Sequence, residues 1–377
     1  MSKLTVEVKG IGFPNKGAEL MLVAIIEQFK QRGVDARFAV EPYGDYQLRA
    51  YHGLYQKARV TKFGVDIGAL VGLMPNKLLN VFGIVKSRDI DVVLDASGFS
   101  YGDQWGPKLV DYRLGTTIES LKKQGKKVVL LPQALGPFED EATKKSAQHI
   151  FSNANLVFAR DPQSYSFAQP ICGNTELQEC PDFTNLVEGT PCNLFDAEQH
   201  EVCVIPNTKM LEKTKLGDEY VDFLVNTIEN VNSCGKKPFL LVHEGKADRE
   251  LAEKVATRCS HNIDILEPID PLKIKWVIGQ SRLVISSRFH GLVSALSQGV
   301  PVIATGWSHK YQCLLKDYDV FKYLVDTSDQ EATNKLVNDL LADEEYHQEV
   351  TMLISKASLV QKQKVIEMWN KVFDNIS

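Results

Sequence analysis

The chain has 377 residues, more than a single hydrophobic core usually organises, so we expect two domains. Hydrophobic residues make up 44% of the chain and charged residues 24%, values that are typical of a folded globular protein and exclude disordered and fibrous classes. The net charge is −5 and the lysines and arginines are dispersed, so we expect no nucleic-acid partner.

The cysteines and the first residues favour a reducing compartment. Seven cysteines are widely spaced, without a CxxC pair or zinc-ligand spacing, so neither a disulfide framework nor a metal site is predicted. The chain begins with the alternating stretch MSKLTVEVKG and not with a long apolar leader, and we therefore expect a cytoplasmic protein.

One apolar run, residues 65–85, bears on a membrane. It is interrupted by Pro75, Asn76 and Lys77, so it predicts one or two buried helices and not a membrane span. It also leaves open a peripheral surface that contacts a membrane or a lipid-linked substrate.

The first half of the sequence alternates strand patterns with helical patterns. The helix predicted at 17–33 has an apolar face that includes Leu20, Val23 and Phe29, and it ends at a glycine. Such alternation predicts βαβ units and a parallel sheet, and we place the first domain at residues 1–166. The predicted strands of this domain are 4–8, 36–40, 91–97, 127–133 and 156–160.

Prolines and glycines interrupt the pattern after the first domain, so we predict a linker at residues 167–200. The α/β alternation then resumes, and a second parallel-sheet domain is predicted at residues 201–345. Residues 346–377 form a helical tail, for which packing back on the first domain is one option. The predicted strands of the second domain are 201–206, 237–243, 262–268, 282–287 and 301–306.

Ligands of open parallel sheets bind beyond the carboxyl ends of the strands. The first strand is followed by GIGFPNKGAE, in which Asn15, Lys16 and Gly17 open a helix and are candidates for binding an anion. The dinucleotide motif fails because Asn15 replaces its third glycine, and the P-loop motif fails because Ala18 replaces its lysine. A tight turn from strand to helix is the structural alternative.

Three further strands of the first domain end in polar residues. Asp95 and Asp103 follow one strand, Gln133 ends the next, and Arg160 ends the last. The planar guanidinium of arginine suits carboxylate and phosphate, so Arg160 is a candidate for anion binding. The alternatives are a turn closed by Asp95 and a turn with exposed charges at Arg160.

The most informative stretch is SSRFHGLVSALSQGVPVIATGWSHKY, residues 286–311. A strand ends here and a helix begins, so Arg288 and His290 lie at a helix N-terminus. The helix dipole, the guanidinium and the imidazole converge, which predicts a site for a multiply charged anion. His309 and Lys310 follow the next strand, and the lysine offers a point charge to phosphate.

The sequence resembles the polysaccharide pyruvyl transferase family. The resemblance rests on NKGAE, LLPQALGPF, ARDPQSY, PDFTNL, IPNTKM and above all on residues 286–311, and it extends from Gly10 to about Lys316. It implies an α/β fold of two Rossmann-like domains with parallel sheets, facing across a cleft as in GT-B enzymes, with a helical C-terminal tail. The implied reaction transfers pyruvate from phosphoenolpyruvate to two hydroxyls of one sugar, forming a cyclic ketal and releasing phosphate.

The resemblance implies that Arg288 and His290 bind phosphoenolpyruvate in the second domain and that the first domain receives the acceptor. Arg160 and Lys310 are further candidate cations for this substrate. The reaction needs an acid and a base, and histidine titrates near neutral pH, so His290 is the candidate acid. The candidate bases are the carboxylates Asp95, Asp103, Glu19 and Glu244.

No cofactor is expected beyond phosphoenolpyruvate as co-substrate. The acceptor that the resemblance implies is a sugar or a lipid-linked oligosaccharide of exopolysaccharide synthesis.

Two other functions stay open. A GT-B glycosyltransferase would use the basic residues for a nucleotide sugar, and the fold alone does not separate the two enzymes. No acidic residue for the ribose precedes Asp317 in the segment after the last strand, which favours pyruvyl transfer. A sugar-binding protein without activity is the third interpretation. Relatives carry more glycines where this chain has DASGF, so the details of sugar binding are left open.

Overall fold

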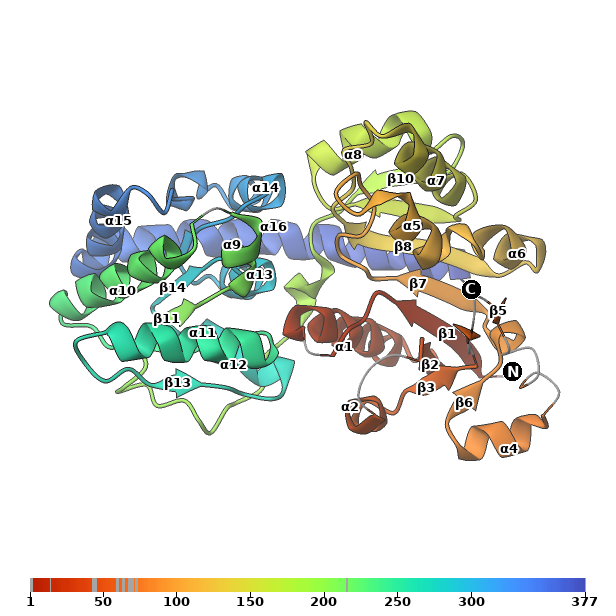
Figure 1. Ribbon diagram of the computed structural model, residues 1–377, viewed down its shortest axis with the longest axis horizontal. Helices are drawn as coiled ribbons and strands as arrows, with labels where there is room; N and C mark the ends of the chain where they lie inside the picture. The colour runs from red at the N-terminus through yellow and green to blue at the C-terminus, as the bar shows by residue number, and fades with distance from the viewer. Residues whose placement is uncertain are drawn as a thin grey trace. The chain divides into compact units, whose positions relative to one another are not determined.

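The computed structural model consists of two compact units. Unit 1 comprises Met1–Phe13, Met21–Phe183 and Val365–Ser377, and unit 2 comprises Pro14–Leu20 and Thr184–Lys364. Each unit has its own parallel sheet with helices around it (Figure 1). The structure describes residues 3–13, 15–42, 46–58, 61–62, 65–66, 71, 74–214 and 216–376.

The sheet of unit 1 has eight strands in the order β10-β9-β8-β7-β1-β2-β3-β6, and all the neighbouring strands run parallel. The order of the strands reverses between β1 and β7, and open α/β sheets bind ligands at such a reversal point. The central strands are rich in valine and leucine and are almost wholly buried, as expected for a parallel sheet covered on both faces. The strands are β1 (Leu4–Lys9), β2 (Ala36–Val40), β3 (Tyr55–Lys57), β6 (Ile84–Val85), β7 (Val92–Asp95), β8 (Lys127–Gln133), β9 (Leu156–Ala159) and β10 (Glu176–Glu179).

The first strand is followed by α1 (Lys16–Gln31), which buries Leu20, Val23 and Phe29 as the sequence predicts. Its first residues, up to Leu20, belong to unit 2. A small antiparallel ladder pairs β4 (Thr61–Lys62) with β5 (Val65–Asp66). The other helices are α2 (Tyr46–Tyr51), α4 (Asn76–Val81), α5 (Gly106–Val110), α6 (Ile118–Lys123), α7 (Glu141–Phe151) and α8 (Pro162–Ala168).

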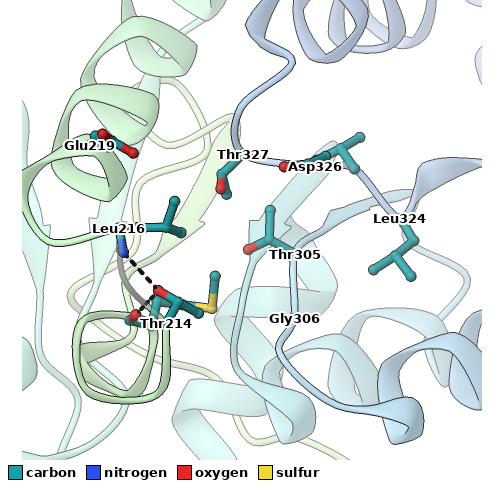
Figure 2. Close-up of a pocket in the computed structure, with 10 residues that line it drawn as sticks. Thr214, Leu216, Glu219, Thr305, Gly306, Leu324, Asp326 and Thr327 are labelled. Carbon is teal, nitrogen blue, oxygen red and sulfur yellow. Dashed lines mark hydrogen bonds between the residues drawn. The ribbon is translucent and has the colours of Figure 1, made fainter.

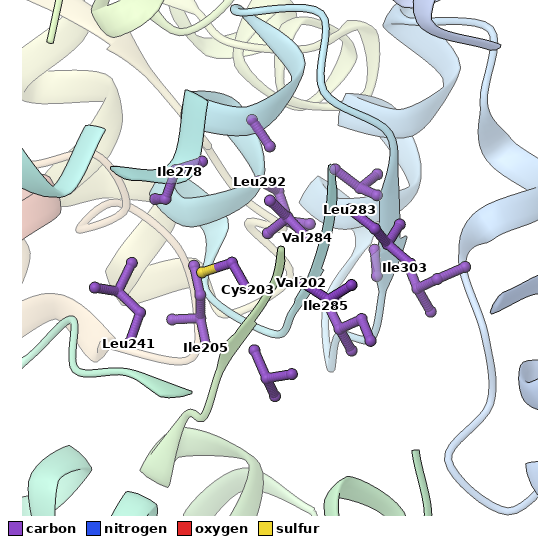
Figure 3. Packing of buried hydrophobic residues seen from close by; sticks show 14 of the residues in the cluster. Val202, Cys203, Ile205, Leu241, Ile278, Leu283, Val284, Ile285, Leu292 and Ile303 are labelled. Atoms are coloured by element: carbon purple, nitrogen blue, oxygen red, sulfur yellow. The ribbon is translucent and has the colours of Figure 1, made fainter. Parts of the chain in front are cut away.

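The sheet of unit 2 has five parallel strands in the order β13-β12-β11-β14-β15, so the chain turns back between β11 and β14. Its core packs β-branched and leucine side chains of β11 and β14 against Ile278 and Leu292 of two helices (Figure 3). The strands are β11 (Val202–Ile205), β12 (Pro238–Leu241), β13 (Ile265–Leu266), β14 (Leu283–Ser286) and β15 (Val302–Ala304). The helices are α9 (Thr208–Lys213), α10 (Asp218–Ser233), α11 (Gly245–Arg258), α12 (Pro271–Gln280), α13 (Phe289–Leu296), α14 (His309–Asp317), α15 (Gln330–Ala342) and α16 (Glu344–Ile376).

The prediction of a parallel α/β fold with a helical C-terminal tail is confirmed. The tail is the helix α16, whose residues from Val365 onward belong to unit 1. There Trp369 packs edge-on against Phe183, and Phe373 packs against Phe29.

The linker predicted at 167–200 is wrong for its first part, because residues 176–179 form β10 at the edge of the first sheet. The sequence of β10, ELQE, is polar and only half-buried, so it lacks the alternation that marks a strand. Unit 1 therefore continues to Phe183, and residues 184–200 belong to unit 2.

The prediction of buried helices at 65–85 is also wrong for the part that can be described. Helix α4 has only six residues and buries Leu79 alone, while Leu78 and Val81 are exposed. A helix of less than two turns presents too few side chains to the core. Residues 67–70, 72 and 73 of the run lie outside the described residues. Within the part of the chain that the structure describes, no helix is long and apolar enough to cross a membrane.

A buried network of charges holds the centre of the first sheet. Lys9 Nζ lies 2.8 Å from Glu41 Oε1, and Lys57 Nζ lies 2.8 Å from Glu7 Oε2. All four side chains are buried, so each charge requires an opposite partner. Burial opposes ionisation of Glu7, but the two lysines outweigh it and lower the pKa of this carboxyl.

Candidate functional site

The candidate site of unit 2 lies where the strand order reverses, at the carboxyl ends of β11, β12 and β14. Asn207 follows β11, Glu244 follows β12, and Ser287 and Arg288 follow β14. The side-chain amide of Asn207 donates a hydrogen bond of 2.7 Å to the carbonyl oxygen of Ser287. The loops after the two central strands are therefore tied together.

Arg288 is buried, and its guanidinium forms ion pairs with Glu244 and Asp248. Asp248 is fully buried and also accepts hydrogen bonds from the backbone N–H (3.2 Å) and hydroxyl (3.0 Å) of Thr208. Burial raises the pKa of the Asp248 carboxyl above its ordinary value. The side chain of Glu244, in contrast, is 25% exposed. Asp248 is thus the more firmly held partner of the arginine, and Glu244 is the more exposed one.

Two helices begin at the same place in this unit. Helix α13 begins beside Arg288, and α1 begins at Lys16, where the Asn15 side chain accepts hydrogen bonds from two backbone N–H groups. Gly17 lies so close to His290 that a Cβ atom at this position would overlap the imidazole ring. The backbone of Asn15 also pairs with that of Glu244. The positive ends of two helix dipoles therefore converge beside His290.

The lysine of this cluster also has a carboxylate partner. Lys16 Nζ lies 2.6 Å from Glu19 Oε2, and the glutamate is buried. The sequence led us to expect cations that face an anion directly. The structure shows that Lys16 and Arg288 are each balanced by acidic side chains.

Sequence reasoning missed His243, which follows β12 and is buried next to this cluster. Burial, and after it the charges of Arg288, His290 and Lys16, lower the pKa of His243 well below 6.5. The imidazole is therefore neutral at physiological pH and adds no positive charge to the cluster. Its position directly after a buried strand is the signal that could have identified it.

The start of α14 joins the same cluster. Lys310 Nζ lies 5.3 Å from the ring centroid of Phe289 and 5.2 Å from that of Trp307, distances typical of cation–π contacts. The hydroxyl of Tyr311 donates a hydrogen bond of 2.9 Å to the carbonyl oxygen of Ser287. His309 is the first residue of the helix. The residues of the cluster that the sequence predicted are Asn15, Lys16, Gly17, Arg288, His290, His309 and Lys310.

The remaining predicted residues belong to unit 1. Asp95 is fully buried and accepts hydrogen bonds from the Ser97 backbone N–H (2.9 Å) and from the Tyr101 hydroxyl. Burial, followed by the charge of Asp95, raises the pKa of Tyr101 well above its ordinary value. This carboxylate thus closes the turn after β7, which was the structural alternative for it.

Asp103 is partly exposed and accepts hydrogen bonds from the backbone N–H groups of Glu139 (2.7 Å) and Asp140 (3.3 Å). It connects the turn after β7 to the loop after β8. Gln133, at the end of β8, is fully buried and donates a hydrogen bond of 3.3 Å to the Leu131 carbonyl oxygen. Of these two side chains, only that of Asp103 reaches the surface.

Arg160 is buried and pairs with Asp182 of the PDFTNL motif at 3.2 Å. Asp161 is also buried and caps α8 by accepting a hydrogen bond of 2.7 Å from the Ser164 N–H. The exposed turn considered as an alternative is therefore wrong. Among the described residues, no group of three or more His, Cys, Asp or Glu could hold a metal ion.

The lowered pKa of His243 predicts a specific dependence of stability on pH. Below about pH 6.5 the unfolded chain binds a proton at this residue, whereas the folded chain keeps it neutral to a lower pH. The free energy of unfolding should therefore fall as the pH drops below about 6.5. We expect the loss between pH 7.5 and 5.5, measured by urea unfolding, to be smaller for His243→Gln than for the wild type.

The control for this experiment is His261→Gln, because the side chain of His261 is 70% exposed. This imidazole pairs with Glu229 at 3.5 Å, an attraction that stabilises the fold when the histidine is charged. The control variant should therefore lose at least as much stability as the wild type over the same pH range. Equal losses in the wild type and in His243→Gln would contradict the assignment of a buried neutral imidazole.

The sequence of the chain matches a known protein family. The sequence matches the polysaccharide pyruvyl transferase family over residues 15–309, which include both helix starts and the segment after β14. No curated protein matches the sequence.

Solved structures with the same fold share little sequence with the chain. The Staphylococcus aureus MnaA–UDP complex is 12% identical over 94% of both chains, with a TM-score of 0.60. UDP-GlcNAc 2-epimerase from Neisseria meningitidis, bound to UDP-GlcNAc, is 13% identical over 97% of this chain and 100% of its own, with a TM-score of 0.57. Anabaena HepE, in complex with UDP and glucose, is 13% identical over 99% of this chain and 98% of its own, also with a TM-score of 0.57.

At these identities the likeness shows the fold, which is the GT-B type that the sequence predicted. The family match extends over most of the chain and includes the cluster around Arg288 and His290. The chain therefore belongs to the polysaccharide pyruvyl transferase family and is a transferase.

Proposed function

We propose that the enzyme transfers pyruvate from phosphoenolpyruvate to two hydroxyls of a sugar in a polysaccharide or its precursor, forming a cyclic ketal and releasing phosphate. The observation that carries the proposal is the convergence of two helix starts with Lys16, Arg288 and His290. Phosphoenolpyruvate has a phosphate and a carboxylate close together, and such a ligand needs several fixed cations and N–H dipoles.

Binding would proceed by exchange at Arg288. Its buried partner Asp248 keeps the guanidinium in place, while the partly exposed Glu244 gives way to the phosphate or carboxylate of the substrate. The arginine is then never left without a negative partner, which avoids the large cost of an unpaired buried charge. Lys310, above its aromatic neighbours, is the further cation that we assign to this substrate.

The exchange also suggests how protons move. We assign to His290 the proton that adds to the methylene carbon of phosphoenolpyruvate, because that addition creates an oxocarbenium-like carbon for the sugar hydroxyl to attack. The displaced Glu244 accepts the proton of that hydroxyl. Phosphate leaves with the C–O bonding electrons and takes the proton held by Glu244. The second hydroxyl then closes the ketal and passes its proton to His290, which restores the acid. Asp103 remains the candidate base of unit 1 because its side chain is partly exposed, whereas Asp95 is fully buried in its turn.

We propose a sugar or a lipid-linked oligosaccharide as the acceptor and the cytoplasm as the compartment. All seven cysteines are free thiols, which supports a reducing compartment. A peripheral membrane contact through the exposed residues of α4 is consistent with a lipid-linked acceptor.

Isothermal titration of the purified protein with phosphoenolpyruvate and, separately, with UDP-glucose tests the donor. We expect saturable binding of phosphoenolpyruvate by the wild type and a loss of at least about tenfold in affinity for Arg288→Ala, because a charge-assisted contact is removed. The control variant Arg249→Ala lacks an exposed arginine of the neighbouring helix surface and should bind like the wild type. Binding of UDP-glucose alone would identify a nucleotide-sugar glycosyltransferase instead.

Gly17 gives a second test that leaves every charged group in place. In Gly17→Ala the new methyl group overlaps the imidazole, so His290 must move away from the helix start. We expect kcat, measured as phosphate release in the presence of an acceptor, to fall at least about tenfold, in line with the contribution of a positioned acid. The matched control is Gly12→Ala, where a Cβ atom meets no neighbour within 4 Å and activity should be retained. Full activity in Gly17→Ala would exclude a role for this contact.

A further inference from the structure

Unit 2 contains a pocket that the proposed donor site does not use. It has a volume of about 580 Å³, which is within the range of small-molecule sites. Its walls come from α9 and the turn after it, the start of α10, the end of β15 and the segment after Tyr323 (Figure 2). The described residues that line it are Met210, Thr214, Leu216, Glu219, Thr305, Gly306, Leu324, Val325, Asp326 and Thr327.

The lining combines hydroxyl groups, carboxylates and apolar side chains. The hydroxyls of Thr214 and Thr305 already donate within the protein and offer acceptor oxygens to a ligand. The carboxylates of Glu219 and Asp326 also accept hydrogen bonds, and Met210 and Leu216 provide an apolar wall. The ten described lining residues include no lysine, arginine or histidine. The carboxylates of Glu219 and Asp326 repel phosphate and carboxylate ligands, so the described lining does not favour phosphoenolpyruvate or a diphosphate.

The pocket is connected to the loop that carries Arg288. Thr305 lines the pocket, and its hydroxyl donates a hydrogen bond of 2.8 Å to Ser287 Oγ, next to Arg288 in the chain. The hydroxyl of Tyr220, the residue after Glu219, lies 2.6 Å from the same Ser287 oxygen. A ligand that contacts Thr305 therefore contacts the short hydrogen-bonded chain that supports the donor loop.

We propose that this pocket binds a neutral, polyhydroxylated ligand, namely a glycosyl unit of the acceptor. Sugar hydroxyls donate to the carboxylates of Glu219 and Asp326 and to the threonine oxygens, while the C–H face of the ring packs on the apolar wall. The identification of this ligand as the acceptor rests on the proposed pyruvyl transfer. The binding of a neutral sugar rests on the pocket alone.

The test measures sugar and phosphoenolpyruvate binding on the same full-length proteins. Methyl β-D-glucopyranoside, methyl β-D-galactopyranoside and methyl β-D-mannopyranoside are the probes, and binding is followed by saturation-transfer NMR titration. The variants are Glu219→Gln, which removes one exposed carboxylate, and Leu216→Trp, which fills the pocket. The control is Glu212→Gln on α9, whose side chain pairs with Lys209 and does not line the pocket.

We expect at least one glycoside to bind, with the same affinity for the wild type and for the control Glu212→Gln. Glu219→Gln should weaken this binding about threefold to tenfold, as for the loss of one hydrogen bond, and Leu216→Trp should abolish it. Phosphoenolpyruvate titrated into the same variants should bind as in the wild type. Circular dichroism and thermal unfolding establish that each variant is folded.

Three results would overturn the inference: no glycoside binds the wild type, a glycoside binds Leu216→Trp undiminished, or only UDP-glucose binds and is lost in Leu216→Trp. The last result would assign the pocket to a nucleotide. Failure of the proposed function gives a different pattern. In that pattern a glycoside binds the wild type and its binding is lost in Leu216→Trp, but phosphoenolpyruvate binds neither the wild type nor any variant. The sugar pocket would then be supported and pyruvyl transfer would be contradicted.

Discussion

The contact between Gly17 and His290 is the constraint on which the site of unit 2 depends. Only a residue without a side chain lets the start of α1 lie against the imidazole at the start of α13. The backbone of Asn15 also pairs with that of Glu244, which follows β12, and this bridge keeps the start of α1 close to the site. Two helix starts, a lysine, an arginine and a histidine are thereby gathered at the reversal point of a parallel sheet.

The buried positive charge of this cluster needs negative partners, and the two carboxylates that pair with Arg288 differ in exposure. Asp248 is fully buried and fastened to Thr208, whereas Glu244 is partly exposed at the start of α11. Replacing Glu244 by an anionic substrate keeps Arg288 neutralised before and after binding. In the proposed exchange a carboxylate would lie beside the substrate, and Glu244 would serve as the base without a further buried charge. His243 stays neutral beneath this cluster because burial and the neighbouring cations oppose its protonation.

Local patterns in the sequence were enough for the parallel strands and for the placement of Arg288 and His290 at a helix start. Runs of valine, isoleucine and leucine between helical segments determine such elements locally. The partners of these residues could not be predicted in this way, because the pairing of Arg288 with Asp248, or of Arg160 with Asp182, joins distant segments and leaves no periodic signal. The polar edge strand β10 was missed because an edge position does not require an apolar pattern.

A crystal structure of the protein with phosphoenolpyruvate bound tests the central claim most directly. The account predicts that the phosphate or the carboxylate of the substrate contacts Arg288 at the joint start of α1 and α13. It also predicts that Arg288 still contacts Asp248 and that Glu244 has moved away from the guanidinium. Phosphoenolpyruvate bound at a place remote from His290, or bound while Glu244 still pairs with Arg288, would contradict the account.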